Sequence, residues 1–345
     1  MPAVTVDNLL ALPRLARLPG GGRVRPVAGV VTARVSLEGE GFQVRRPFPG
    51  PELAIADPFL LLDHIGAVEY APGEAKGAPW HPHRGFETVT YMIDGALEHH
   101  DSTGGGGYIA DGATQWMTAG AGILHDEVPP AWLVQKGGLF HGVQLWVNLP
   151  AALKWTPPRY QDIGAKAVTL LAAFDGGALV RLIAGELDGH RGPGVTHTPI
   201  AYAHATIYAG SRLELAWPRH FNALVYALAG RGRAGEERRP FGEGQLVAFG
   251  NGDGVVIEAE PVQDSRAPAL EVLLLGGQPI REPVVFHGPF VMNTRQEIFQ
   301  AIRDYHAGRM GQIPPTRFDF SRLHGDRGPA IDHETGPDEE KAGGA

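Results

Sequence analysis

An internal repeat constrains the fold of this chain more than any other feature of its sequence. The segment FETVTYMIDG, which begins at Phe86, aligns without gaps on FNALVYALAG, which begins at Phe221, at an offset of 135 residues. Further along, the segment that begins at Asp111 aligns on the one that begins at Glu243, at an offset of 132, and glycine or proline coincides at four positions. The shared order and nearly equal offsets favour a true repeat over chance similarity. Two copies of one strand-turn-strand unit predict two stacked barrels of the same fold.

Short β-branched and aromatic runs support an all-β fold with many turns. Runs such as TVTYMI and GVQLWVNL are separated by some of the 48 glycines and 29 prolines, a pattern typical of sandwiches and barrels. One helix is expected late in the chain, where Thr294 and Glu297 form a capping box and apolar residues recur at helical spacing before Gly308. The expected parts are an N-terminal extension (1–22), a first barrel (23–155), a second barrel with helix 294–308 (156–311), and a disordered tail (325–345).

Composition excludes several classes of function. The net charge of the 345 residues is −8, so no chain-wide basic field indicates nucleic-acid binding. No apolar run reaches the ~20 residues that a membrane helix requires, and Asp7, Pro13 and Arg14 interrupt the N-terminal leucines, which argues against a signal peptide. The chain has no cysteine, which excludes disulfides and thiolate metal sites. A cytoplasmic location is therefore expected.

Two pairs of alternating polar residues predict a metal site in the first barrel. His81 and His83 stand one residue apart before a strand, so their imidazoles should project to the same face. In the second strand of the repeat, His125 and Glu127 have the same spacing. If the two strands are neighbours, three neutral imidazoles and a carboxylate would suit iron(II), manganese, nickel, copper or zinc. The repeat alignment gives non-ligating residues in the second barrel, namely Ala216, Pro218, Ile257 and Ala259.

Some candidate roles stay open at this point. Glu87 follows His83 by four residues and has the strand parity of the histidines, so it is a second candidate for the carboxylate ligand. His99 and His100 begin a polar, glycine-rich stretch and are expected to be solvated. His64, His141, His197, His204 and His287 stand singly and are expected to be structural. Four apolar residues could either line an aromatic pocket or fill the barrel core: Phe86, Trp116, Met117 and Ile123.

Four segments resemble the pirin family, which are proteins with two cupin barrels. They are HPHRGFETVTYMIDG, QWMTAGAGILHDE, the upstream DPFLLLDHIG, and the downstream GPFVMNT with its helix. The resemblance covers roughly Arg25 to Gly311. The chain departs from the family pattern at Ala113, where an acidic residue is common, and at Asp126, which lies between two ligands. Neither departure changes a proposed ligand. It implies two stacked jelly-roll barrels and the ligands His81, His83, His125 and Glu127. Glu87 would then orient an imidazole or a bound water.

The resemblance also implies a function. Some pirins are similar to quercetin 2,3-dioxygenases, which bind a flavonol as its anion and use dioxygen to cleave its heterocycle with release of carbon monoxide. On that basis iron(II) is the expected metal, a flavonol and dioxygen are the expected substrates, and Glu127 is both ligand and general base. The alternative is a regulatory binding protein, a transcriptional cofactor or partner of a metabolic enzyme, whose affinity depends on the metal's redox state. A third possibility is an isomerase or hydrolase acting on another enolisable substrate. No direct contact with nucleic acid or membrane is expected, and a protein partner is possible in the regulatory case.

Overall fold

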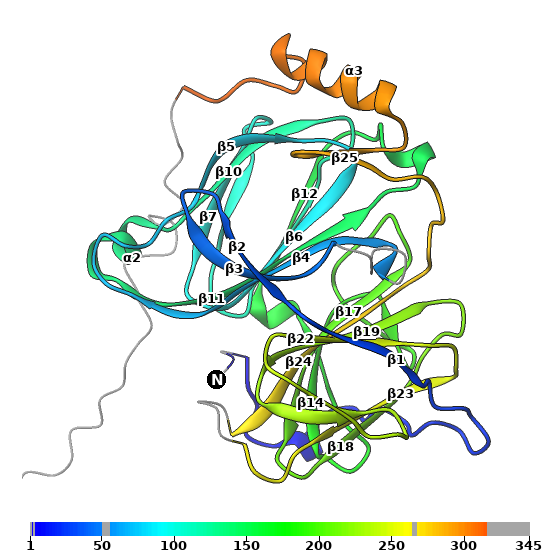
Figure 1. The fold of residues 1–345 in the computed structure, drawn as a ribbon. Coiled ribbons are helices and arrows are strands. Elements are labelled where there is room, and N and C mark those ends of the chain that lie inside the picture. Colours follow the sequence, from blue (N-terminus) through cyan, green and yellow to red (C-terminus); the bar gives the residue numbers. More distant parts are fainter. Residues whose placement is uncertain (1, 3, 50–55, 264–267, 316–345) are drawn as a thin grey trace, which may run out of the picture.

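Two β-barrels are stacked on each other in the computed structural model, which describes residues 2, 4–49, 56–263 and 268–315 (Figure 1). Each barrel consists of a seven-stranded sheet and a four-stranded sheet, so the expected pair of cupin barrels is confirmed. The expected tail, 325–345, lies outside the described residues. Among the described residues, neither α-helix has the length and apolar composition needed to cross a bilayer.

The first barrel contains the predicted metal-binding segments. Its larger sheet has the strand order β12 (Arg159–Ile163), β9 (Thr114–Thr118), β6 (Phe86–Asp94), β11 (Gly138–Asn148), β4 (Phe59–Tyr70), β3 (Phe42–Phe48) and β2 (Arg34–Glu38). Its smaller sheet has the order β5 (Ala78–His83), β10 (Ile123–Val128), β7 (Leu97–Asp101) and β8 (Gly106–Ile109). A short helix, α2 (Ala131–Lys136), connects β10 to β11.

The second barrel repeats this plan. Its larger sheet has the order β1 (Val27–Thr32), β22 (Gln245–Phe249), β19 (Asn222–Ala229), β24 (Ala269–Gly277), β17 (Ile200–Tyr208), β14 (Ala178–Ala184) and β13 (Thr169–Ala172). Its smaller sheet has the order β18 (Arg212–Ala216), β23 (Gly254–Ala259), β20 (Arg231–Ala234) and β21 (Arg239–Gly242). The shorter elements are η1 (Leu9–Ala11), η2 (Ala151–Leu153), η3 (Ala165–Ala167), β15 (Glu186–Leu187), β16 (His190–Arg191), β25 (Val285–His287) and β26 (Phe290–Met292).

The strand pairing agrees with the sequence repeat. Val89 pairs with Trp116 in the first barrel, and Leu224 pairs with Ala248 in the second. These are the counterparts that the offsets of 135 and 132 give. The two segments that align in sequence therefore occupy the same places in the two sheets.

The two larger sheets pack against each other through a shared apolar core. Val89 and Tyr91 of β6 belong to this core together with Leu224 and Tyr226 of β19. Side chains alternate along a strand, so β6 directs these residues toward the second barrel and Thr88 and Thr90 into the first. Polar groups cross the same interface, where the Tyr91 hydroxyl lies 2.9 Å from His204 Nδ1.

The barrels exchange edge strands, which corrects the expected division at residues 155 and 156. Strand β1 falls within the expected first barrel but pairs with β22 of the second, and β12 falls within the expected second barrel but pairs with β9 of the first. The residues before β1 also pack on the second barrel, and Leu15 is buried in its core. An edge strand has unpaired backbone groups, and the exchanged strands satisfy them. Figure 1 shows β1 crossing from one barrel to the other.

The C-terminal segment returns to the first barrel, and Figure 1 shows its helix α3 (Arg295–His306) over one end of that barrel. The predicted helix is confirmed, with its Thr294–Glu297 capping box. Its residues Ile298 and Ala301 pack with Leu124 of β10 in one apolar cluster. A buried ion pair of 2.7 Å between Arg84 Nη1 and Asp304 Oδ2 fixes the helix at this position.

A chain that ends at residue 155 should not fold as an isolated barrel. It keeps every predicted ligand but lacks β12, β26 and α3, and it exposes the shared core to water. We expect a poorly soluble product without a cooperative thermal transition, whereas a chain ending at residue 315 keeps every described element and should unfold cooperatively. Circular dichroism of both products would check this. Cooperative unfolding and metal loading of the shorter chain would contradict it.

Candidate metal centre

Pairing between β5 and β10 brings three histidines together. His81 lies directly opposite His125, and His83 lies opposite Ile123. The ring centroids are 4.3 Å apart for His81 and His125, 4.7 Å for His81 and His83, and 4.8 Å for His83 and His125. The alternation predicted from sequence therefore places all three imidazoles in one cluster, whose ligand atoms lie within 4.8 Å of one another.

Hydrogen bonds to backbone carbonyls orient two of these rings. His81 Nδ1 lies 2.7 Å from the Pro79 carbonyl oxygen, and His83 Nδ1 lies 3.2 Å from that of Pro289. A carbonyl only accepts, so in the neutral rings Nδ1 has the proton and Nε2 has the lone pair. The two Nε2 atoms then face each other at 3.0 Å with no proton between them. Such an arrangement is repulsive alone and is stabilised by a cation, so the residues fit a metal.

Burial keeps two of the clustered imidazoles, those of His83 and His125, neutral. Burial lowers the pKa of His83 well below 6.5, and the nearby charge of His81 lowers it further. The pKa of His125 is also well below 6.5, first because of burial and then because of His81 and His83. His125 Nε2 is buried and has no hydrogen-bond partner among the described residues. Neutral imidazoles with available lone pairs are the form that binds a transition metal.

Glu127 lies next to this cluster and is held by neutral donors. Its Oε1 accepts a hydrogen bond of 2.7 Å from Thr90 Oγ1, and its Oε2 accepts one of 2.7 Å from Gln144 Nε2. Its carboxylate forms a second close group with His99 and His125, which shares His125 with the first group. The four predicted ligands are thus adjacent, with His125 at the centre.

Glu87 lies on the other face of β6. Its carboxylate accepts a 2.6 Å hydrogen bond from Thr118 Oγ1 and lies 3.9 Å from Arg159 Nη2. The contacts recorded for it among the described residues include none with the three clustered imidazoles. Arg84 and Gly85 separate strands β5 and β6, and Gly85 has φ of +92°. The alternation of side chains between the two faces of a strand therefore does not continue from His83 to Glu87. The structure does not bring Glu87 to the metal cluster.

The expectation of a solvated His99 and His100 is wrong. Both lie on β7 and are buried, with 0% and 5% exposure. His99 lies beside the metal cluster, where its Nδ1 is 3.2 Å from His125 Nδ1. The sequence signal that could have found it is the short run LEHHD before the glycines, which reads as a strand that ends at Asp101.

A cavity of about 580 Å³ opens beside the cluster. His81, His83 and Glu127 form part of its wall, and Trp80, Trp146 and Phe286 are among its aromatic residues. The four apolar residues considered from sequence do not line it and belong to buried apolar clusters instead: Phe86, Trp116, Met117 and Ile123. The lining residues were missed because they come from β5, β11 and the returning C-terminal segment, which only the fold brings together.

The second barrel has apolar residues in place of the ligands. Its pairing places Leu213 opposite Ile257 and Leu215 opposite Val255, so the counterparts of His81 and His83 are two buried leucines. This corrects the counterparts Ala216 and Pro218, because the connection between the two strands differs in length between the barrels. Within the described part of the chain, both groups of side chains that could hold an ion lie in the first barrel, one of three histidines and one of two histidines and a glutamate.

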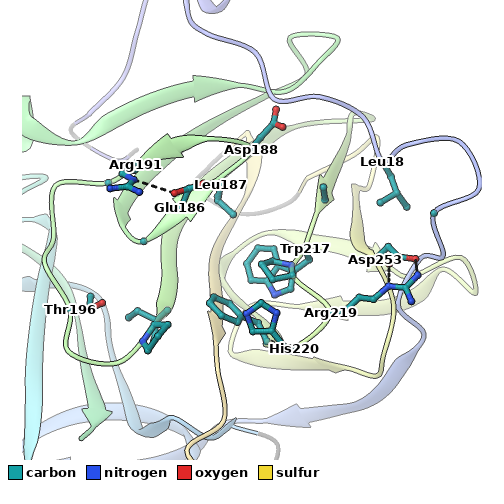
Figure 2. Close-up of a pocket in the computed structure, with 18 of the residues that line it drawn as sticks. Leu18, Glu186, Leu187, Asp188, Arg191, Thr196, Trp217, Arg219, His220 and Asp253 are labelled. Atoms are coloured by element: carbon teal, nitrogen blue, oxygen red, sulfur yellow. Dashed lines mark hydrogen bonds and ion pairs between the residues drawn. The ribbon is translucent and has the colours of Figure 1, made fainter. Parts of the chain in front are cut away.

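A larger pocket of about 1040 Å³ lies in the second barrel (Figure 2). Four of its charged side chains form two ion pairs, Arg191 with Glu186 and Arg219 with Asp253, and Asp188 accepts a hydrogen bond from the Ala16 backbone. The indole of Trp217 donates to the backbone of Asn222. The paired charges and the single imidazole of His220 in this pocket do not form a metal-binding set.

Two stacked barrels of this topology, with a histidine cluster in the first, define a bicupin. Residues 41–147 match the family described as Pirin, and residues 202–311 match the Pirin C-terminal cupin domain. The chain belongs to the pirin family.

Similar proteins include both named pirins and named dioxygenases. A protein of Pseudomonas aeruginosa provisionally named a quercetin 2,3-dioxygenase is 42% identical over 79% of this chain and 93% of its own length. Human pirin is 37% identical over 84% of this chain and 95% of its own length. The crystal structure of a quercetin 2,3-dioxygenase from Acinetobacter baumannii covers 84% of this chain and 100% of its own, with a TM-score of 0.78 and 37% identity.

The His125→Ala variant should lose most of the bound metal and retain the fold. It removes the imidazole at the centre of both ligand groups, and the second barrel accommodates the apolar Ile257 at the corresponding position. Metal analysis of the purified variant and its circular dichroism spectrum would check both parts. Full metal occupancy would show that the ligand set is misassigned.

The metal-free protein should lose stability as the pH falls below 6.5. His64, His83 and His125 have folded-state pKa values well below 6.5, chiefly because of burial, so the unfolded chain binds protons that the folded protein does not. Each such group lowers the free energy of unfolding by about 1.4 kcal/mol per pH unit between its unfolded and folded pKa values. Urea unfolding at several pH values would measure the slope, and His83→Gln should reduce it by about one proton. A slope unchanged by this variant would contradict the assignment.

Proposed function

We propose that His81, His83, His125 and Glu127 bind one divalent transition metal, with iron(II) as the working ion. The observation that carries this proposal is the convergence of three imidazoles whose Nε2 atoms have no proton to share, next to a buried carboxylate. Three neutral imidazoles and one carboxylate suit a first-row ion that keeps open coordination positions. Bound there, iron(II) would supply a positive centre for an anionic oxygen ligand and for dioxygen chemistry.

We further propose that the protein is a quercetin 2,3-dioxygenase-type enzyme that acts on flavonols. The cavity volume of about 580 Å³ lies within the roughly 300–1,000 Å³ typical of small-molecule sites. Trp80, Trp146 and Phe286 provide apolar contact area for a planar aromatic substrate. The names of the Pseudomonas and Acinetobacter relatives support the same substrate class.

Charged residues at the wall of the cavity fit a polyhydroxylated substrate. Arg46 forms two hydrogen bonds of 2.6 Å with Asp63 and a third of 2.6 Å with Glu38. All three side chains line the cavity. Their carboxylates can accept hydrogen bonds from phenolic hydroxyls while the guanidinium holds them in position.

Glu127 is the proposed general base. Thr90 and Gln144 hold its two oxygens from the interior of the barrel, beside His125. A flavonol whose 3-hydroxyl reaches this carboxylate would transfer that proton to it and become the anion that a cationic centre binds. Each carboxylate oxygen has a second lone pair, so one of them can take this proton while both hydrogen bonds remain.

Glu127→Gln should separate this role from a structural one. The amide keeps the shape but loses the negative charge and the proton acceptor, so metal affinity should fall moderately and flavonol-dependent oxygen uptake by ~10²–10⁴-fold. The matched control is Glu87→Gln, a buried carboxylate on the opposite face of β6. It should retain metal and turnover within a few-fold.

The measurements are metal content, oxygen consumption and carbon monoxide release with a flavonol and iron(II), on both variants and the parent protein. Equal losses in both variants would contradict the role of Glu127. If the iron-loaded parent consumes no oxygen with any flavonol, the dioxygenase proposal fails and the regulatory alternative takes its place.

A further inference from the structure

A second buried histidine lies directly behind the central imidazole of the metal cluster. His99 on β7 faces His125 on β10, with 3.2 Å between their Nδ1 atoms and 5.0 Å between ring centroids. The His99 ring stacks on Tyr160 at a centroid distance of 5.1 Å and an interplanar angle of 26°. His99 and His125 are both fully buried, so the contact between them lies in the interior of the barrel.

Gln115 determines which of the two imidazoles donates in this contact. Its amide Nε2 lies 3.0 Å from His99 Nδ1, and an amide nitrogen only donates, so His99 Nδ1 accepts. Two unprotonated Nδ1 atoms would repel each other at 3.2 Å, so a neutral His125 has its proton on Nδ1, where it shares the one lone pair of His99 Nδ1 with the Gln115 amide, and Nε2 has none. If the Gln115 amide were reversed, its oxygen would accept, and the proton of His99 would be on Nδ1. The proton of a neutral His125 would then be on Nε2, which would have no lone pair for a metal. Only the first arrangement makes His125 a metal ligand.

Asp101 completes the chain of contacts. With Nδ1 accepting, the proton of neutral His99 is on Nε2, which lies 3.6 Å from Asp101 Oδ2, beyond hydrogen-bond distance, so the carboxylate acts on the ring through its charge. The other oxygen of Asp101 accepts from the backbone and hydroxyl of Thr103, at 2.8 and 2.5 Å, and these contacts fix the carboxylate. A carboxylate at the far end of a histidine relay favours the ring orientation and increases the basicity of the metal-binding nitrogen.

We propose that His99 and Asp101 are positioning residues that hold His125 in the tautomer and orientation that bind the metal. This inference rests on the proposed metal centre, and it adds to it two residues that do not touch the ion. The order of contacts is Asp101, His99, His125 and then the metal-binding Nε2. His81 and His83 are oriented by backbone carbonyls, whereas His125 depends on side chains, so its orientation is open to mutation.

The chain contains a matched pair for comparison on the same two strands. His100 and Asp126 are also buried, and His100 Nδ1 lies 2.9 Å from Asp126 Oδ1. His100 follows His99 in β7, and Asp126 follows His125 in β10. Because side chains alternate along a strand, this pair lies on the other face of the sheet. A substitution there disturbs the same strands without removing a contact to His125.

The experiment measures Co(II) binding to the purified full chain at equilibrium, by competition with a chromophoric chelator. The variants are His99→Phe, which keeps an aromatic ring next to Tyr160, and Asp101→Asn, with His100→Phe and Asp126→Asn as controls. His99→Phe and Asp101→Asn should weaken Co(II) binding about 10–100-fold, as is usual when a group that orients a ligand is lost. The controls should stay within twofold of the parent protein.

The visible ligand-field spectrum of the Co(II) protein gives a readout that a loss of stability alone would not change. It should shift in His99→Phe and keep the parent shape in His100→Phe. Thermal unfolding of the metal-free variants shows whether each one is folded. If His99→Phe is unfolded, Asp101→Asn provides the test.

Three outcomes would overturn the inference in distinguishable ways. If the parent binds no Co(II), the metal centre itself fails, and the positioning role fails with it. If the parent binds but His99→Phe and Asp101→Asn stay within twofold, the metal centre stands and the positioning role is wrong. If His99→Phe empties the site as completely as His125→Ala, His99 is a ligand and not a positioning residue.

Discussion

Strand β6 is buried on both faces, and this constraint connects the fold to the site. One face packs Val89 and Tyr91 into the core shared by the barrels, and the other directs Thr90 to Glu127. A shift of one residue in its register would exchange these two sets of side chains. The apolar packing between the barrels therefore also fixes the position of the carboxylate. The second barrel thus contributes to the site through the shared core.

The histidine cluster is costly for the fold without a cation. His83 and His125 are buried, His125 Nε2 has no hydrogen-bond partner among the described residues, and the Nε2 atoms of His81 and His83 face each other, which costs free energy. An ion that binds only the folded state offsets this cost and stabilises the protein in proportion to its affinity and concentration. Metal binding and folding stability are thus linked through the same side chains. Desolvation, the cause of the lowered pKa of His83 and His125, also keeps the rings in the form that binds the ion.

The sequence was informative where local alternation and the repeat determine the structure. They were sufficient to predict the two barrels, the final helix, and the meeting of His81, His83 and His125. Inferences that required long-range knowledge failed. The side-chain alternation that starts at His83 does not continue to Glu87, because Gly85 interrupts the strand. Strands β1 and β12 each pair with the other barrel, and no local sequence pattern encodes that pairing. The glycine-rich stretch predicts a loop at His99, but the strand continues to Asp101 and the turn begins only after it.

The most direct test of the metal centre is the position of the ion in crystals of the iron-loaded protein, located by anomalous scattering at the iron absorption edge. The account predicts one peak per chain, within about 2.0–2.2 Å of Nε2 of His81, His83 and His125, with Glu127 as the carboxylate ligand. It also predicts that His99 lies behind His125 and outside bonding distance of the ion. A peak bonded to His99 in place of His81 and His83, a peak in the second barrel, or no peak at all would contradict it.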